Sequence, residues 1–431
     1  MILIDINAEK MKEIEEKHFR YTKELVRSRI SEKLEEIEHN FCDEYGQLFV
    51  EFLKQLLDES NLLLKKIILM DKEKLIDFPN SIKEDASFEF IHKYLDFYCS
   101  IKRCEDKINI YKSKIPDFRR KNKKQILDKV KELCQQIQEF ASNYNIKFEQ
   151  SCQYKNKDQF IKDLNNLKKS ITDKISPKIN PVKEYLLEIF DYDSFVKEDD
   201  KWSAYLFTSE MDISVCPYCN RNYINTTISE KGKARPEIDH FYPKSIYPFF
   251  ALTLYNFIPC CHTCNSKKRE KDTVKQRILY PYLEQFGENV RFIPRLYTEK
   301  DLEKSNKLSE EDLYDIKFFF GNSDNFKVEI EDKNEDINKK EKIKNSNKTF
   351  LLEDFYQFHK KDVRNIIKKA IIYNQSRIEE LYKNYCPDLF ESEEEIVQMI
   401  FPNYYDGENL DNKEILSKLR RDIYKDLGIW R

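Results

Sequence analysis

The sequence predicts a mainly α-helical protein with a small α+β insert near its middle. Only 6 of its 431 residues are glycine, while 40% are apolar and 35% are charged, with a mean hydropathy of −0.74. Such a composition is typical of helix-rich soluble proteins rather than of barrels or sandwiches. The insert is marked by a window from Cys216 to Thr273 that holds five of the eleven cysteines. A chain of this length predicts two or three domains.

Residues 1–200 are expected to form a helical scaffold or partner-docking region. This stretch contains a single glycine, Gly46, and its apolar residues recur at steps of three and four. The clearest series is Ile126, Val130, Leu133, Ile137 and Phe140. The spacing suits several antiparallel helices that pack on one another, and it equally suits a short coiled coil that docks a partner or forms an oligomer. Both interpretations stay open at this point.

Residues 281–431 are expected to form an α-rich C-terminal region with one β-hairpin. Residues 316–330 alternate around a Gly/Asn/Asp turn, which predicts the hairpin. The mixed-charge run at 331–345 predicts a solvated loop. Beyond Leu352 the apolar residues return to a helical period, and a last helix is expected after Glu414.

Charge separates the cysteine window from the rest of the chain. The formal net charge is −3, yet residues 216–280 contain 11 Lys and Arg against 5 Asp and Glu, and all other residues contain 64 against 73. A basic segment in an acidic frame suits a site that meets phosphate. The first residues show no secretion signal and no apolar run is long enough to span a bilayer, so a cytoplasmic protein without a membrane partner is expected.

Four cysteines predict a structural zinc site inside a module of residues 205–280. They form two C-x-x-C pairs, Cys216 with Cys219 and Cys261 with Cys264. Two such pairs supply the four soft ligands of tetrahedral zinc, and in a reducing cytosol clustered thiols favour metal over disulfides. Cys260 is expected to be a small buried thiol because Cys261 keeps the two-residue spacing. His262 is expected to lie next to the zinc site without binding the metal, since four thiolates already complete the coordination of zinc.

Residues suited to phosphodiester hydrolysis lie between and just after these pairs. The reaction needs a base that activates water and a cation that stabilises charge on the phosphate. Histidine titrates near physiological pH, so His240 suits the base, and the adjacent Asp239 offers a hard carboxylate for Mg²⁺ or Mn²⁺. Asn265 would add a neutral oxygen ligand. Because neighbours on a regular strand face opposite sides, this arrangement requires a bend at Asp239-His240.

Basic residues follow the second cysteine pair. If a helix begins near Cys261, then Asn265, Lys268 and Arg269 share one of its faces. Lys268, with help from Lys267 and Arg269, is therefore expected to neutralise the phosphate of a substrate.

The order of these residues resembles the HNH, or ββα-metal, nuclease family. The matching elements are the first C-x-x-C pair, Glu237-Ile-Asp239-His240, Asn256, and Cys264-Asn265-x-x-Lys268. The resemblance implies that His240 is the general base, that Asp239 and Asn265 hold the catalytic cation, and that Asn256 holds the loop and orients the histidine. Glu237 is either an acid that supports the site or a surface residue.

More loosely, YPYLEQFGENVRF and the closing SKLRRDIYKDLG are similar to the HNH nuclease subunit of Septu-type anti-phage defence systems. That resemblance implies a DNA endonuclease working beside a separate ATPase, because this chain has no G-x-x-x-x-G-K-[ST] motif. Two alternatives stay open. One is a ribonuclease with the same site, for example one that cleaves transfer RNA, and the other is a non-catalytic zinc module used for assembly.

Overall fold

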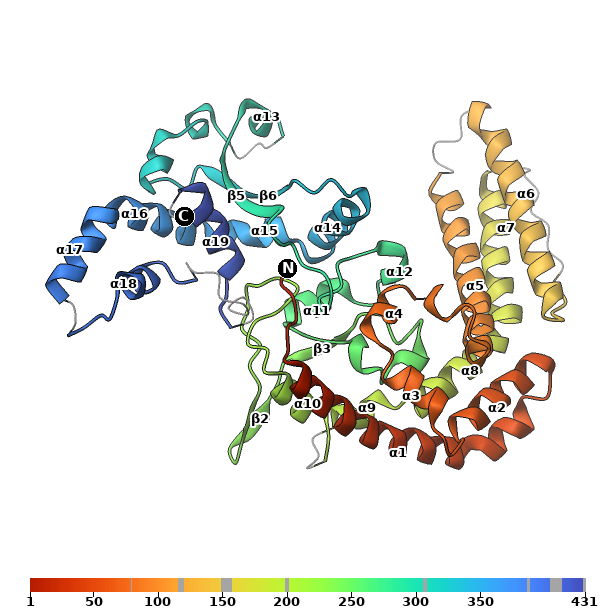
Figure 1. Cartoon of the computed structure of the whole chain (residues 1–431). Coiled ribbons are helices and arrows are strands. Elements are labelled where there is room, and N and C mark those ends of the chain that lie inside the picture. Colours follow the sequence, from red (N-terminus) through yellow and green to blue (C-terminus); the bar gives the residue numbers. More distant parts are fainter. Residues whose placement is uncertain are drawn as a thin grey trace. The chain divides into compact units, whose positions relative to one another are not determined.

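The computed structural model describes residues 1–78, 80–114, 120–148, 157–197, 201–304, 308–385, 388–403 and 413–428, with the side chains of residues 120–122 left out. These residues are mostly helical and include three two-stranded antiparallel sheets, which confirms the mainly α fold class (Figure 1). None of their helices combines the length and the apolar character that crossing a membrane requires.

The chain divides into two compact units. One consists of residues 1–18, 195–243 and 255–431, and is here called the cysteine unit. The other consists of residues 19–194 and 244–254, and is here called the helical unit. The three-part division expected from the sequence, 1–200, 205–280 and 281–431, stays a prediction.

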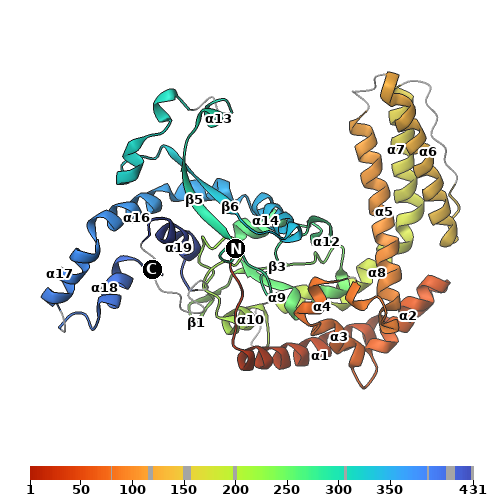
Figure 2. The same ribbon diagram turned by 45° about the horizontal axis from the view of Figure 1, so that its top comes forward.

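The described residues of the helical unit lie mostly in helices. They are most of α1 (Ala8–Asn40), then α2 (Glu44–Leu56), α3 (Leu62–Ile68), α4 (Lys72–Ile76), η1 (Asn80–Ile82), η2 (Ala86–Phe88), α5 (Glu89–Ser113), α6 (Arg120–Asn143), α7 (Lys157–Ser170), η3 (Ile171–Ile175), α8 (Ser176–Ile189), part of α9 (Tyr192–Val196) and η4 (Pro248–Phe250). Figures 1 and 2 both show α5, α6 and α7 side by side.

Gly46, the single glycine of residues 1–200, is required for a steric reason. Asp43 caps α2 by accepting a hydrogen bond from the Gly46 amide at 2.8 Å, which folds the first turn of α2 back over Phe41. A Cβ at position 46 would lie 2.6 Å from the Cβ of Phe41. The turn between α1 and α2 is therefore tight enough to exclude any larger residue.

The apolar series of α6 packs inside the helical unit. Ile126, Val130, Leu133 and Ile137 are buried. Phe140 stacks on Phe97 of α5, with ring centroids 5.2 Å apart. Helix packing within the chain is confirmed, and this packing covers the seam that also suggested an oligomer. A role of residues 1–200 in assembly stays a prediction.

Part of the loop between the two cysteine pairs belongs to the helical unit. Phe250 of η4 meets Phe78 edge-on, with ring centroids 4.8 Å apart. Thr253, fully buried, donates a hydrogen bond from its hydroxyl to the carbonyl of Ile67 at 2.8 Å. The run YPFFALTL, residues 247–254, therefore forms part of the core of the helical unit.

The cysteine unit holds the sheets and the remaining helices. Its strands are β1 (Thr227–Ser229), β2 (Gly232–Ala234), β3 (Glu237–His240), β4 (Phe257–Cys260), β5 (Val290–Leu296) and β6 (Phe326–Asp332). Its helices are α10 (Ala204–Met211), η5 (Leu254–Asn256, but for its first residue), α11 (His262–Lys268), α12 (Thr273–Gln276), α13 (Glu299–Leu302), η6 (Glu310–Asp312), η7 (Ile316–Phe320), α14 (Ile337–Phe350), α15 (Leu352–Tyr356), η8 (Gln357–His359), α16 (Lys360–Ile372), α17 (Gln375–Tyr385), α18 (Glu393–Ile400) and α19 (Ser417–Asp426).

The hairpin predicted at residues 316–330 is wrong. Ile316–Phe320 form the 3₁₀ helix η7, which ends at Gly321 with a φ of 65°. The strand that follows, β6, pairs instead with β5 in antiparallel register, from Val290 opposite Asp332 to Leu296 opposite Phe326. Alternation identified one strand correctly, but its partner lies some thirty residues earlier in the chain, where a local pattern cannot reveal it.

The solvated loop predicted at 331–345 is also wrong for most of its length. Asp336 caps α14 by accepting from the Asn338 amide at 2.8 Å. Ile343, Ser346 and Phe350 form a narrow buried stripe on the helix. Because that stripe is short, the many charges around it masked the helical period.

The predicted closing helix is confirmed as α19. Its Lys418 and Asp422 lie one turn apart, form an ion pair and are both buried. Asp422 also accepts a hydrogen bond from the Phe292 amide of β5 at 2.8 Å. Through this carboxylate the last helix is tied to the β5–β6 sheet.

Candidate functional site

The four predicted ligand cysteines come together in one buried cluster. The sulfur atoms of Cys216, Cys219, Cys261 and Cys264 all lie within 4.8 Å of one another. Four converging thiols are the ligand set that tetrahedral zinc prefers, so these residues fit a zinc ion. Cys260 is fully buried outside this cluster, which agrees with its expected role as a small buried thiol.

Backbone geometry explains why the first pair can converge. The Asn220 amide donates to the Cys216 carbonyl at 2.8 Å, and Asn220 has a φ of 51°, so the chain turns sharply after Cys219. Asn222 then donates a side-chain hydrogen bond to the sulfur of Cys261 at 3.2 Å. An amide donor of this kind favours a thiolate, which is the form that binds metal.

Two strands and a helix bring the remaining predicted residues together. Strands β3 and β4 pair antiparallel, with Asp239 opposite Ile258 and His240 opposite Phe257. Helix α11 begins directly after Cys261 and packs on β3. The order strand, strand, helix is the one that the ββα resemblance implies.

Asp239 is a buried residue with two protein partners. Its side chain is 3% exposed, accepts from the Tyr218 hydroxyl at 2.7 Å and forms an ion pair with Lys268 at 3.0 Å. Burial raises the pKa of the Asp239 carboxyl, and the charge of Lys268 opposes that rise. Both carboxylate oxygens therefore already have donors.

Lys268 does not lie where the sequence placed it. Its side chain is fully buried, and its ammonium donates to Asp239 and to the His240 carbonyl, the latter at 2.6 Å. On this geometry Lys268 holds β3 to α11 and does not reach the surface to meet a phosphate. Lys267 and Arg269 are exposed, and Arg269 follows the helix with a φ of 50°.

His240 ends β3 on the face of the strand opposite Asp239. The register of β3 and β4 is regular through this residue, so the bend expected at Asp239-His240 does not occur. The imidazole is half-buried and meets Phe257 edge-on, with centroids 5.3 Å apart. Asp239 and His240 are therefore adjacent in sequence but point to different sides of the strand.

Asn256 holds the chain just after His240. It is fully buried, its Oδ1 accepts from the Tyr242 amide at 2.7 Å, and its Nδ2 donates to the Tyr242 carbonyl at 3.0 Å. The Asn256 carbonyl also accepts from the Phe241 amide at 2.9 Å. These bonds are what the expected loop-holding role requires, while a contribution to catalysis stays a prediction.

Glu237 is the residue that sequence reasoning left undecided. Its carboxylate contacts the Asn265 amide nitrogen at 2.6 Å and the His262 Nδ1 at 2.6 Å. The bond with Glu237 raises the pKa of His262, whose side chain is 81% exposed. The sequence could have placed Glu237 beside Asn265, because alternate residues of a strand face the same side and residues 237 and 239 therefore both face α11.

The expected cation ligands Asp239 and Asn265 have separate partners. Asp239 bonds Lys268 and Tyr218, whereas the Asn265 amide bonds Glu237. Each oxygen of the Asp239 carboxylate already accepts one hydrogen bond, so a magnesium ion there would have to compete with Lys268 and Tyr218. The assignment of Asp239 and Asn265 as cation ligands stays a prediction. The accessible polar groups on this side of β3 are instead Glu237, His262 and Asn265.

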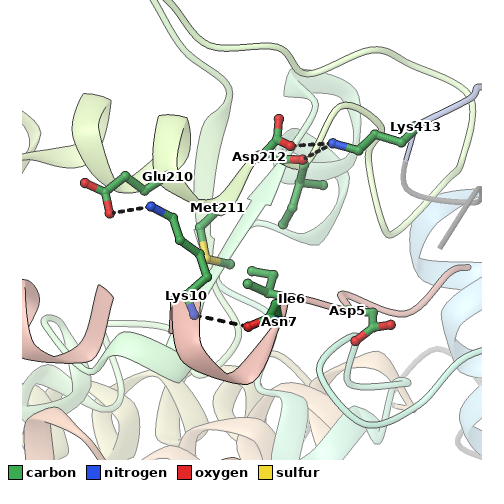
Figure 3. Close-up of a pocket in the computed structure, with 9 residues that line it drawn as sticks. Asp5, Ile6, Asn7, Lys10, Glu210, Met211, Asp212 and Lys413 are labelled. Atoms are coloured by element: carbon green, nitrogen blue, oxygen red, sulfur yellow. Dashed lines mark hydrogen bonds and ion pairs between the residues drawn. The ribbon is translucent and has the colours of Figure 1, made fainter. Parts of the chain in front are cut away.

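A cavity of about 360 Å³ elsewhere in the cysteine unit contains none of the predicted site residues. Figure 3 shows its lining, where Lys10 pairs with Glu210 at 3.3 Å and Lys413 pairs with Asp212. Two of its basic groups are therefore already neutralised.

Comparison with known proteins gives one local similarity. The Septu protein PtuB of Bacillus thuringiensis is 30% identical over 93 residues, which are 22% of this chain and 34% of that protein. The chain thus spans about a third of the length of this curated relative. No family model and no solved structure matches the chain.

We predict that the purified protein holds about one zinc ion per chain and that Cys216→Ser removes it, because one of four thiolate ligands is lost. Elemental analysis measures the content. Cys260→Ala is the matched control, since this thiol is buried outside the cluster, and it should keep the metal. Wild-type protein without zinc, or Cys216→Ser protein with its zinc intact, would contradict the assignment.

We also predict that Lys268→Met destabilises the cysteine unit by about 3–5 kcal/mol, because Asp239 is left buried without its counter-charge. Thermal unfolding followed by circular dichroism measures the loss. Lys267→Met, at the exposed neighbouring position, should leave the melting temperature nearly unchanged. Equal melting of both variants would show that Lys268 is not the structural partner of Asp239.

Proposed function

We propose that this protein is a phosphodiester hydrolase of the HNH type and acts as an endonuclease. The observation that carries the proposal is the immobilised, half-exposed imidazole of His240. A general base must be held in a fixed position yet stay within reach of water, and His240 meets both conditions.

Three contacts fix His240. Lys268 holds its carbonyl, Asn256 holds the two residues that follow it, and Phe257 lies against the edge of its ring. Two of these partners are buried polar groups whose own hydrogen bonds would be lost if the strand shifted. The polar core beneath β3 thus supports a rigid base.

In the proposed reaction, His240 takes a proton from water and the water oxygen attacks phosphorus. The bond between phosphorus and the leaving 3′-oxygen breaks, giving the 5′-phosphate and 3′-hydroxyl ends that the resemblance implies. A solvent water molecule donates the proton that the leaving oxygen takes up, and the imidazolium of His240 returns its proton to solvent. The exposed Lys267 and Arg269 would offset the phosphate charge. A Mg²⁺ or Mn²⁺ ion would add Lewis-acid stabilisation of the phosphate charge, and at Asp239 it would have to compete with Lys268 and Tyr218.

The similarity to Septu protein PtuB supports a role in anti-phage defence. We propose DNA as the substrate, with RNA as the alternative that the same chemistry allows. A separate ATPase subunit is the proposed partner, as the Septu-type resemblance implies, and the cytoplasm is the proposed location.

We predict that His240→Ala lowers cleavage by about 10²–10⁴-fold, the usual contribution of a general base. The full-length protein is assayed on plasmid DNA, single-stranded DNA and total RNA, with Mg²⁺ or Mn²⁺ added and in their absence. The arms identify the substrate and test the metal requirement.

His39→Ala, an exposed histidine at the end of α1, is the matched control and should cleave like wild type. Zinc content and melting temperature of His240→Ala should also stay close to wild type, which separates lost chemistry from lost fold. Wild-type cleavage by His240→Ala would refute the nuclease assignment, and absence of cleavage by any arm would favour the zinc assembly module.

A further inference from the structure

Four cations gather where α11 ends and α14 passes. Lys267, Arg269 and Lys348 are exposed, and Lys271 is half-buried. Helices α11 and α14 pack on each other, which brings Lys348 of α14 close to the end of α11. In agreement with this packing, burial lowers the pKa of Lys271, and the positive charges of its neighbours, Lys348 first, lower it further. Within the part of the chain that the structure describes, none of the four forms an ion pair.

Few negative charges balance this surface. Glu270 is exposed in the same segment, while Asp272 caps α12 by accepting from the Val274 amide at 3.1 Å. Lys268 adds no exposed charge, because it is paired with Asp239 inside the core. Like charges held close together cost free energy, so their juxtaposition suggests an anionic partner.

Helix α14 is held firmly enough to keep Lys348 in place. Phe350 stacks on Tyr218 with ring centroids 4.3 Å apart, and Tyr218 in turn bonds Asp239. The Ser346 hydroxyl accepts from the Leu279 amide at 3.0 Å, and Asn345 donates to the Gln276 carbonyl. Aromatic and polar anchors therefore join α14 to the segment that follows α11.

We propose that Lys267, Arg269, Lys271 and Lys348 form one surface that binds the phosphate backbone of a nucleic acid. The proposal rests on the proposed function and extends it, because Lys348 comes from α14, far outside residues 205–280. Such a surface would grip phosphates beside the scissile one without reading base sequence. Unlike a single lysine, it spans two elements and sets the path of the strand.

The test is a binding measurement that needs no cleavage. Each variant is made in the full-length chain together with His240→Ala, so that no substrate is lost. Fluorescence anisotropy follows short labelled duplex DNA, single-stranded DNA and single-stranded RNA at several salt concentrations. Lys271→Glu/Lys348→Glu should weaken binding by roughly tenfold or more and lower the slope of log K against log salt by about 2 on duplex DNA, since two phosphate contacts are removed.

Lys340→Glu is the matched control, because it reverses an exposed lysine two turns earlier on the same helix. It should bind within about twofold of the parent. Lys348→Glu alone should lower the slope by about 1. Because this position is exposed, the single variant also controls for misfolding of the double variant. Polyglutamate serves as an unlabelled anionic competitor. The proposal would be overturned if the double variant bound as well as the parent, if Lys340→Glu weakened binding equally, or if polyglutamate bound better than every nucleic acid.

The two proposals can fail separately. Nucleic-acid binding that depends on these lysines, in a protein whose wild type cleaves nothing, would sustain this surface and remove the nuclease. If the Lys271→Glu/Lys348→Glu protein with intact His240 still cleaved nucleic acid and bound it with wild-type affinity, the nuclease proposal would stand and this surface would be refuted.

Discussion

The four-cysteine cluster is the constraint on which the rest of the cysteine unit depends. It brings residues 216–219 and 261–264 together, and three residues of the turn at the first pair also contact more distant elements. Tyr218 stacks on Phe350 of α14 and donates a hydrogen bond to Asp239. The Cys219 carbonyl accepts from the Tyr356 hydroxyl at 2.8 Å, and the Asn220 carbonyl accepts from the backbone amide just before α19. Elements far apart in sequence therefore converge on one short turn.

Asn220 shows how much a single residue in this turn can hold. Its carbonyl accepts from the Leu416 amide at 2.7 Å, and its side-chain oxygen accepts from the Ser417 hydroxyl and the Lys418 amide, each at 3.1 Å. The first amides of a helix lack partners within the helix, so Asn220 acts as a cap supplied from another segment. If the cluster holds zinc, loss of the metal should therefore also destabilise the start of the last helix, α19.

A buried ion pair between β3 and α11 is the second constraint on the site. Lys268 and Asp239 neutralise each other in the core, and the same ammonium fixes the backbone of His240. The sequence motif thus divides into two sides of one strand. Asp239 and Lys268 stabilise the fold from within, while His240 lies half-exposed on the other face and Lys267 and Arg269 remain in solvent.

The sequence by itself determined the helical fold class, which four cysteines form the cluster, and the burial of Cys260, because helical period and C-x-x-C spacing are local properties. It also contained the order strand, strand, helix around Asp239, His240 and Asn265. Only the tertiary structure decided that Lys268 is buried while Lys267 is not, that β6 pairs with β5, and that α14, which carries Lys348, packs on α11. These outcomes depend on which distant segment covers a side chain or supplies its counter-charge, and no local spacing records that.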